Sequence, residues 1–383
     1  MDYKRHSLIT AMLYFMMTGC CCLLVGSSLT QLMDLYQLPL NKVVILGSVF
    51  AIGRVVIVNF SGNICKEKGS RFCVIAGALC FAVYLFGIGL IHNYYLAYLL
   101  CFIGGCGQGL QDTVTPILLA KASKEDYSAN MSIGQALFDA GCFIAPLLIG
   151  VMLKVNIPFY FSYFVMGIMA LCVFFMGLRL KDEKDEEQEE EIVTPMYVNN
   201  PYRTVIFAFI FIFFNSSLFG VYCTYITSFG IHMGLSEADS SFLLSLFNIG
   251  AMFGSFAFAP VLKKVKEIDV MIFNTSVSAV LLGIVLYVKN ISLYYILFPA
   301  IGFMLGVIFG VAISIVTRIC FKDIGEVTPK LGLMSGMADV STPVFTGYII
   351  SRMGIMFSME YIMFANIICI LMGILIKKDI VKE

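Results

Sequence analysis

The chain has 383 residues, of which 60% are hydrophobic and only 13% are charged. This composition excludes an ordinary soluble globular protein and predicts apolar segments that face lipid. The formal net charge is zero, so the charge balance does not indicate a nucleic-acid partner.

Twelve apolar stretches long enough to cross a bilayer follow one another along the chain. A span needs about 20 apolar residues, and backbone polar groups in hydrocarbon must bond within their own segment. We therefore expect an all-α membrane protein. The predicted spans are roughly 7–30, 42–64, 72–91, 95–120, 129–153, 158–179, 203–229, 239–262, 270–288, 292–318, 329–351 and 355–376.

The basic residues orient the predicted spans. Of the 25 Lys and Arg residues, 20 lie at the termini or on one alternate set of loops, and only Lys42, Lys154, Lys289 and Arg352 lie on the other set. By the positive-inside rule, we expect a multi-pass protein of the cytoplasmic membrane with both termini in the cytoplasm.

An acidic run, KDEKDEEQEEE at residues 181–191, separates six predicted spans from the other six. Such a charge run is typical of a solvated linker. We therefore predict an N-terminal six-helix bundle at 1–180, a cytoplasmic linker at 181–202 and a C-terminal six-helix bundle at 203–383.

The two predicted bundles are related by a repeat. Under one constant shift of 197 residues, Gly53 falls on Gly250 and Gly105 falls on Gly302. Six spans separate equivalent positions, and an even number preserves orientation. The repeats are therefore parallel, an arrangement that places a solute site near the midplane at the interface of the repeats.

The loop after the second span reads Gly62-Asn-Ile-Cys-Lys66-Glu-Lys68-Gly69-Ser-Arg71. This stretch resembles the loop 2–3 signature of the major facilitator superfamily, which has a glycine, a charged residue four positions later and then Gly-x-Arg. That signature commonly has aspartate at the place of Lys66. The resemblance implies the twelve-helix major facilitator fold, transport by alternating access and a gating role for Gly62, Lys66, Gly69 and Arg71.

Three further stretches resemble the fucose:proton symporter branch of this superfamily. They are residues 107–116, GQGLQDTVTP, residues 130–141, which contain Gln135, Phe138, Asp139 and Gly141, and a stretch from Gly302 in the tenth span to Pro343 in the eleventh. The resemblance implies sugar transport and places Asp112 at the branch's proton-linked glutamate. The first span departs from the branch, because residues 20–28 contain no ionisable residue.

Four ionisable residues, Arg54, Asp112, Asp139 and Asp339, lie near the middle of predicted spans. A charged group there is costly and marks a pathway or binding site by default. Asp112 lies nine residues before Lys121, about 14 Å from the cytoplasmic end at helical rise.

Asp112 and Asp139 are the candidate proton-coupling residues, because a carboxyl group in a low-dielectric site can bind and release a proton near neutral pH. Gln108 and Gln111 lie beside Asp112, and Gln135 lies one helical turn from Asp139. These three amides and Asp139 are candidate substrate-binding residues. The alternative for Asp112 is a structural role, in which its side chain forms a hydrogen bond between helices and only stabilises their packing.

Arg54 demands an anionic partner, since a guanidinium cannot lose its charge. The sequence leaves two alternatives open. Arg54 pairs with Asp112 or Asp139, or it binds an anionic substrate.

In the second repeat, Asp339, Asn215 and Asn248 are candidate substrate-binding residues. Polar residues of this kind also join helices to one another, so a structural role is the alternative.

We expect a secondary active transporter, not an enzyme, that moves a small polar solute, most simply a sugar, with a proton. The sequence does not distinguish the proton from sodium. The alternative is an organic-anion carrier or a drug or metabolite exporter of the same fold. We expect no cofactor, no metal and a monomer in the lipid bilayer. An intramembrane aspartyl protease is disfavoured because its Gly-x-Gly-Asp signature is absent.

Overall fold

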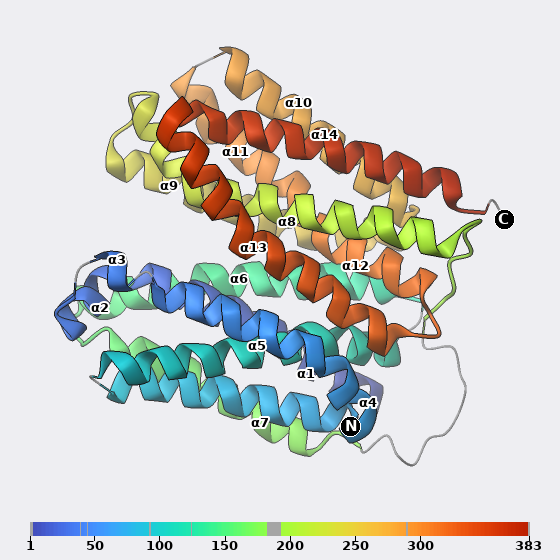
Figure 1. The fold of residues 1–383 in the computed structure, drawn as a ribbon, viewed down its shortest axis with the longest axis horizontal. Coiled ribbons are helices and arrows are strands. Elements are labelled where there is room, and N and C mark those ends of the chain that lie inside the picture. Colours follow the sequence, from blue (N-terminus) through green and yellow to red (C-terminus); the bar gives the residue numbers. More distant parts are fainter. Residues whose placement is uncertain are drawn as a thin grey trace. The chain divides into compact units, whose positions relative to one another are not determined.

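The computed structural model describes residues 3–38, 40–43, 45–91, 93–123, 125–181, 193–288 and 290–381. These residues are almost entirely helical (Figure 1). The helices are α1 (Tyr3–Ser27), α2 (Leu29–Tyr36), α3 (Leu40–Val43), α4 (Ile45–Leu90), α5 (Tyr94–Ala122), α6 (Tyr127–Lys154), α7 (Tyr160–Leu178), α8 (Pro201–His232), α9 (Glu237–Leu262), α10 (Glu267–Val288), α11 (Ile291–Leu305), α12 (Ile308–Ile319), α13 (Ile324–Met353) and α14 (Met356–Asp379).

The helices account for all twelve predicted spans. Nine helical segments of the described chain are long and apolar enough to cross a membrane, among them the 46-residue α4 and a single segment over α11 and α12. Helix α4 supplies two spans, because its helical path is broken at Gly69. Helices α5 and α13 complete the twelve. They are less apolar because they contain Gln108, Asp112 and Asp339, among other polar residues.

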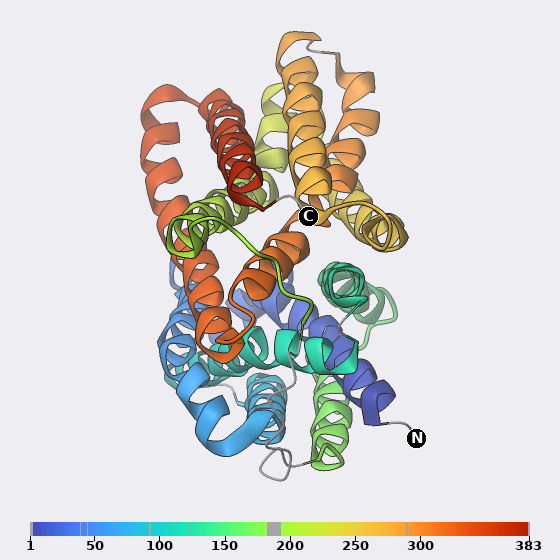
Figure 2. The ribbon, with the colours of Figure 1, turned by 90° about the vertical axis from the view of Figure 1, so that its right-hand side faces the viewer.

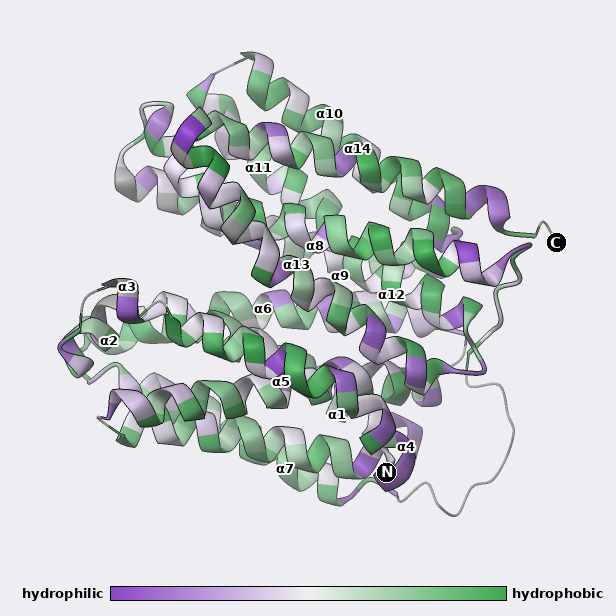
Figure 3. Cartoon of the chain, viewed as in Figure 1, coloured by the Kyte–Doolittle hydropathy of each residue, from purple (hydrophilic) through white to green (hydrophobic). Residues whose placement is uncertain are grey.

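The distribution of polarity along the helices is that of a membrane bundle. Hydrophobic residues predominate along the middles of the helices, and hydrophilic residues gather toward their ends (Figure 3). Several helices begin at a polar side chain that accepts hydrogen bonds from backbone N–H groups of the first turn, which would otherwise be unpaired. Asn93 caps α5, Asn200 caps α8, Ser236 caps α9 and Asn290 caps α11.

The chain forms two compact units, each built of long helices packed side by side (Figures 1 and 2). The first comprises Met1–Lys124, Ala140–Ile192 and Asp323–Gly336. The second comprises Glu125–Asp139, Val193–Lys322 and Met337–Glu383. Helices α6 and α13 therefore each contribute to both units, an exchange absent from the division predicted at 1–180 and 203–383.

Residues 182–192 of the predicted linker lie outside the described residues. The segment after them belongs to the second unit, is extended and is hydrogen-bonded to the ends of two helices of that unit. Met196 N donates to Arg318 O at 2.9 Å, and Asn199 N donates to Asp379 O at 2.8 Å. The end of the linker is thus attached to the ends of α12 and α14.

The 197-residue shift also relates the helix contacts inside the two units. In the first, the position of a Cβ on Gly105 of α5 is already occupied by the backbone carbonyl of Phe50 on α4. In the second, the carbonyl of Phe247 on α9 occupies the same position at Gly302 of α11. Each pair of helices crosses so closely that only glycine fits.

Candidate functional site

An ion pair between α4 and α5 is the main charged feature within the first unit. Arg54 Nε donates to Asp112 Oδ2 at 2.7 Å, and the two side chains are only 10% and 16% exposed. The guanidinium also donates from Nη2 to Ser335 Oγ of α13 at 3.1 Å. Of the two alternatives open for Arg54, the structure shows pairing with an acid, namely Asp112.

Glycines allow the first part of α13 to lie directly against this pair. A Cβ on Gly332 would sit 3.2 Å from the Cβ of Asp112. Farther along, a Cβ on Gly62 of α4 would sit 2.7 Å from the carbonyl oxygen of Gly325 and 2.9 Å from Cγ of Pro329. Both distances are shorter than ordinary van der Waals contact, so a larger residue would push α13 away from α4.

The two candidate glutamines of α5 are buried, and one of them bonds along its own helix. Gln111 Nε2 donates to Thr115 Oγ1 at 2.8 Å, and Thr115 Oγ1 donates back to Gln111 O at 2.8 Å. Gln108 is 6% exposed and lies one turn before Asp112. Gln111 is therefore already engaged within α5.

Lys66 of the predicted gating loop, at the place where the family signature commonly has aspartate, forms an ion pair with an acid of α13. Lys66 Nζ bonds Glu326 Oε1 in the first turn of α13. Gly69 has φ +84°, a backbone conformation that favours glycine, and it breaks α4 between two spans. Arg71 Nη2 donates to Leu178 O at the end of α7, at 3.0 Å.

Asp139 of the second unit lies in a different environment. It is 4% exposed, Gln135 Nε2 donates to its Oδ1 at 3.3 Å, and Ser255 Oγ of α9 lies 3.5 Å from its Oδ2. Ser255 Oγ is also 3.0 Å from Ala251 O, to which it donates. Within the described part of this unit, no cation lies within ion-pair distance of Asp139.

The elements around Asp139 carry a further acid and two ion pairs. The Cys223 thiol of α8 lies within electrostatic range of both Asp139 and Asp339 of α13. Toward the start of α6, Lys263 Nζ lies 2.9 Å from Asp126 Oδ1. At the adjoining ends of α10 and α12, Arg318 Nη1 donates to the buried Glu267 Oε1 at 2.9 Å. These lysine and arginine side chains are therefore engaged with other acids.

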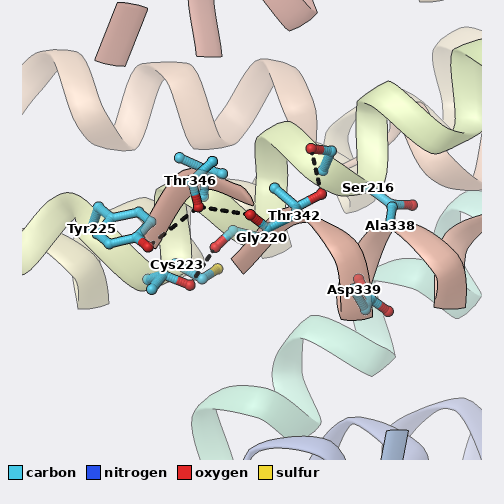
Figure 4. A pocket seen from close by; sticks show the side chains of 11 residues that line it. Ser216, Gly220, Cys223, Tyr225, Ala338, Asp339, Thr342 and Thr346 are labelled. Atoms are coloured by element: carbon cyan, nitrogen blue, oxygen red, sulfur yellow. Dashed lines mark hydrogen bonds between the residues drawn. The ribbon is translucent and has the colours of Figure 1, made fainter. Parts of the chain in front are cut away.

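The remaining candidates of the second repeat lie on α8, α9 and α13. Asp339 lines a cavity between α8 and α13 together with hydroxyl-bearing residues (Figure 4). Asn248 Oδ1 accepts a long contact of 4.0 Å from the Cys223 thiol, which also lines the cavity. Asn215 is 5% exposed and does not belong to the cavity wall. Of the candidates of the second repeat, Asp339 therefore lies in the wall of this cavity.

Three side chains of these clusters were missing from the sequence prediction: Ser255, Ser335 and Glu326. Serines are common within membrane helices, so nothing in the sequence distinguished Ser255 or Ser335 from the others. Glu326 lies nine residues before Ser335, just outside the predicted span, and only its contact with Lys66 reveals it. In the described residues, no group of three His, Cys, Asp or Glu side chains is suited to hold a metal ion.

A family model described as Major Facilitator Superfamily matches residues 7–338. The chain belongs to the major facilitator superfamily. It is accordingly a multi-pass membrane protein and a secondary transporter of small molecules, not an enzyme. The all-helical fold predicted from the sequence is confirmed.

The chain is similar to three named proteins, YdiN, NorA and FucP. The inner membrane transport protein YdiN of Escherichia coli (strain K12) is 24% identical over 356 residues, covering 90% of this chain and 83% of YdiN. The quinolone resistance protein NorA of Staphylococcus aureus (strain MRSA252) is 23% identical over 255 residues, 62% of each chain. A crystal structure of the E. coli fucose:proton symporter FucP matches with a TM-score of 0.80 at 13% identity, over 96% of this chain and 98% of FucP.

Proposed function

We propose that this chain is a proton-coupled transporter of a small polar solute and that Asp139 binds the transported proton. One observation supports the proposal above all others. The candidate acids have contrasting surroundings, since Asp112 is paired with Arg54 at 2.7 Å, whereas Asp139 has hydrogen-bond contacts with the neutral side chains of Gln135 and Ser255.

This contrast assigns different roles to the two acids. A carboxylate beside a guanidinium serves as its counter-ion, and removal of that charge would leave the buried cation uncompensated. A buried carboxyl group among neutral partners is expensive in its charged form and exchanges a proton when water reaches it. We therefore assign proton binding to Asp139 and charge compensation of Arg54 to Asp112.

The neutral form of Asp139 also fits its hydrogen-bond partners. Oδ1 accepts a hydrogen bond from the Gln135 amide. The single proton of Ser255 Oγ can go to Asp139 Oδ2 at 3.5 Å or to Ala251 O at 3.0 Å. When it goes to the nearer Ala251 O, the lone pairs of Ser255 Oγ can accept a proton from neutral Asp139.

The pairing of Arg54 also bears on the class of solute. With its charge matched by Asp112, Arg54 offers little net attraction to an anion, which disfavours an organic-anion carrier. The fold likeness to the fucose:proton symporter and the sequence likeness to NorA do not determine the solute. We retain a sugar, carried inward with the proton, as the expected solute. The likeness to NorA favours export as the second candidate direction.

Uptake by proteoliposomes tests the proposal. Purified full-length chain is reconstituted, and accumulation of D-glucose, D-glucosamine and D-glucuronate is measured under an inside-alkaline gradient, an inside-acid gradient, a sodium gradient and no gradient. The three solutes share one ring and differ mainly in charge.

We expect a pH gradient to drive accumulation of a neutral or cationic member of the panel. An inside-alkaline gradient that drives uptake indicates symport, and an inside-acid gradient that drives uptake indicates exchange of the solute for a proton. Accumulation of the uronate alone, or accumulation driven only by sodium, would contradict the proposal. Empty liposomes supply the background.

A further inference from the structure

The cavity on the second unit lies between α8 and α13 and has a volume of about 200 Å³. Its wall of 11 residues contains one charged side chain, Asp339, and no Lys, Arg, His, Asn or Gln. Asp339 lies at one side of the group and Tyr225 at the other (Figure 4). The polar atoms between them are mostly hydroxyl oxygens.

Most of these hydroxyl groups have already committed their protons. Thr224 Oγ1 donates to Gly220 O at 2.8 Å, and Thr346 Oγ1 donates to Thr342 O at 2.8 Å. Thr342 Oγ1 in turn donates to Ser217 Oγ at 2.8 Å. A hydroxyl has one proton and two lone pairs, so each of these threonines has only acceptor capacity left for a ligand.

The phenol hydroxyl of Tyr225 also donates its proton within the protein. It lies 3.2 Å from Thr346 Oγ1, and the proton of Thr346 is already given to Thr342 O. Tyr225 is therefore the donor in this contact and presents lone pairs to the cavity. Ser216 and Ser217 are the two wall hydroxyls whose protons these bonds do not assign.

The cavity thus offers a ligand a carboxylate and a row of acceptor oxygens, with few donors. A sugar hydroxyl both donates and accepts, so such a wall would satisfy only half of its hydrogen-bonding capacity. A primary ammonium group carries a positive charge and three donors with no acceptor, which matches the wall.

We propose that this cavity binds the protonated primary amine of a small solute, with Asp339 as its counter-ion and the α8 and α13 hydroxyl oxygens as its acceptors. The inference rests on the proposed transport function and narrows its solute to one that carries a primary amine, such as an amino sugar, in place of a neutral sugar. A volume of about 200 Å³ accommodates an amine of a few carbon atoms and far exceeds a bare sodium ion.

Binding to the purified full-length chain in detergent tests this inference without any flux. Isothermal titration calorimetry compares n-butylammonium, which has charge and donors, with tetramethylammonium, which has charge but no N–H, and with n-butanol, which is neutral. Sodium chloride is titrated separately. Protection of Cys223 from N-ethylmaleimide, followed by peptide mass spectrometry, reports whether a probe occupies the cavity.

We expect n-butylammonium to bind at least about tenfold more tightly than either comparator and to slow the modification of Cys223. The variant Asp339→Asn should bind it about tenfold more weakly or worse, since a charge-assisted bond is replaced by a neutral one. The exposed Asp34→Asn of α2 is the matched control and should bind as the wild type does.

Equal binding of tetramethylammonium, tighter binding of n-butanol, or sodium binding with no response to the amine would each overturn the inference. The comparison among probes uses the wild type, so it stands even where Asp339→Asn fails to fold. Amine binding without pH-driven uptake would support the cavity assignment and defeat the proposed function. Proton-driven uptake of D-glucose without amine binding would do the reverse.

Discussion

Arg54 Nε lies 2.7 Å from Asp112 Oδ2, and the residue equivalent to Arg54 in the second repeat is Ala251. The crossing of α4 and α5 recurs as the crossing of α9 and α11, but the charge occurs in one repeat only. The ion pair is therefore an addition to the duplicated packing and not a part of it.

Neutralising one member of this pair should reduce the stability of the fold more than neutralising both members. In Asp112→Asn the guanidinium loses its charged partner, and we expect a loss of about 3 kcal/mol in stability, as for other buried pairs. The double variant Arg54→Gln with Asp112→Asn removes both charges and should recover much of that loss. Thermal unfolding of the wild type, the two single variants Arg54→Gln and Asp112→Asn and the double variant, all in one detergent, measures the coupling energy between the two side chains. A double variant less stable than both single variants would argue against a paired role.

The close helix crossing predicts a contrast between two glycines of the first unit. In Gly105→Ala the new methyl group would meet the backbone carbonyl of Phe50, so we expect a destabilisation of about 1–3 kcal/mol from overpacking. Gly47→Ala on α4 is the control, because nothing lies within 4 Å of its Cβ position. Melting temperatures of the two variants test the contrast, and equal values would mean that the helices are not tightly packed at Gly105.

Periodic and compositional features of the sequence predicted the fold, but they could not show which side chains contact one another in the candidate site. Twelve apolar stretches were sufficient for the helical spans, because bilayer thickness sets their length. The 197-residue shift identified Gly53, Gly105 and their counterparts, because close helix crossings require small residues. The choice between Asp112 and Asp139 as partner of Arg54 depended on which helices are in contact, which local pattern does not encode. Ser255 and Glu326 became recognisable only through the side chains that they contact.

The Lys66–Glu326 ion pair should weaken as the pH falls. Its hydrogen bond to Lys66, together with the charge of that lysine, holds the pKa of Glu326 below its ordinary value. A carboxyl group with a lowered folded-state pKa stabilises the fold above its unfolded pKa, and this contribution disappears as the pH falls through the folded-state value. The wild type should therefore exceed Glu326→Gln in melting temperature at pH 7, and the gap should close toward pH 3.

Salt provides the control for this prediction. Both side chains are about half exposed, at 48% and 52%, so added salt should shrink the gap at pH 7. A gap that is independent of both pH and salt would show that Glu326 acts through packing alone.

The most direct test of the central claim is pH-driven accumulation compared with solute exchange in Asp139→Asn proteoliposomes, using whichever solute of the panel the wild type accumulates. The amide resembles a permanently protonated carboxyl group, so we predict that accumulation driven by the pH gradient is lost while exchange across the membrane without a gradient persists. Asp34→Asn serves as the control and should retain both. Intact pH-driven accumulation in Asp139→Asn would contradict the assignment of the transported proton to Asp139.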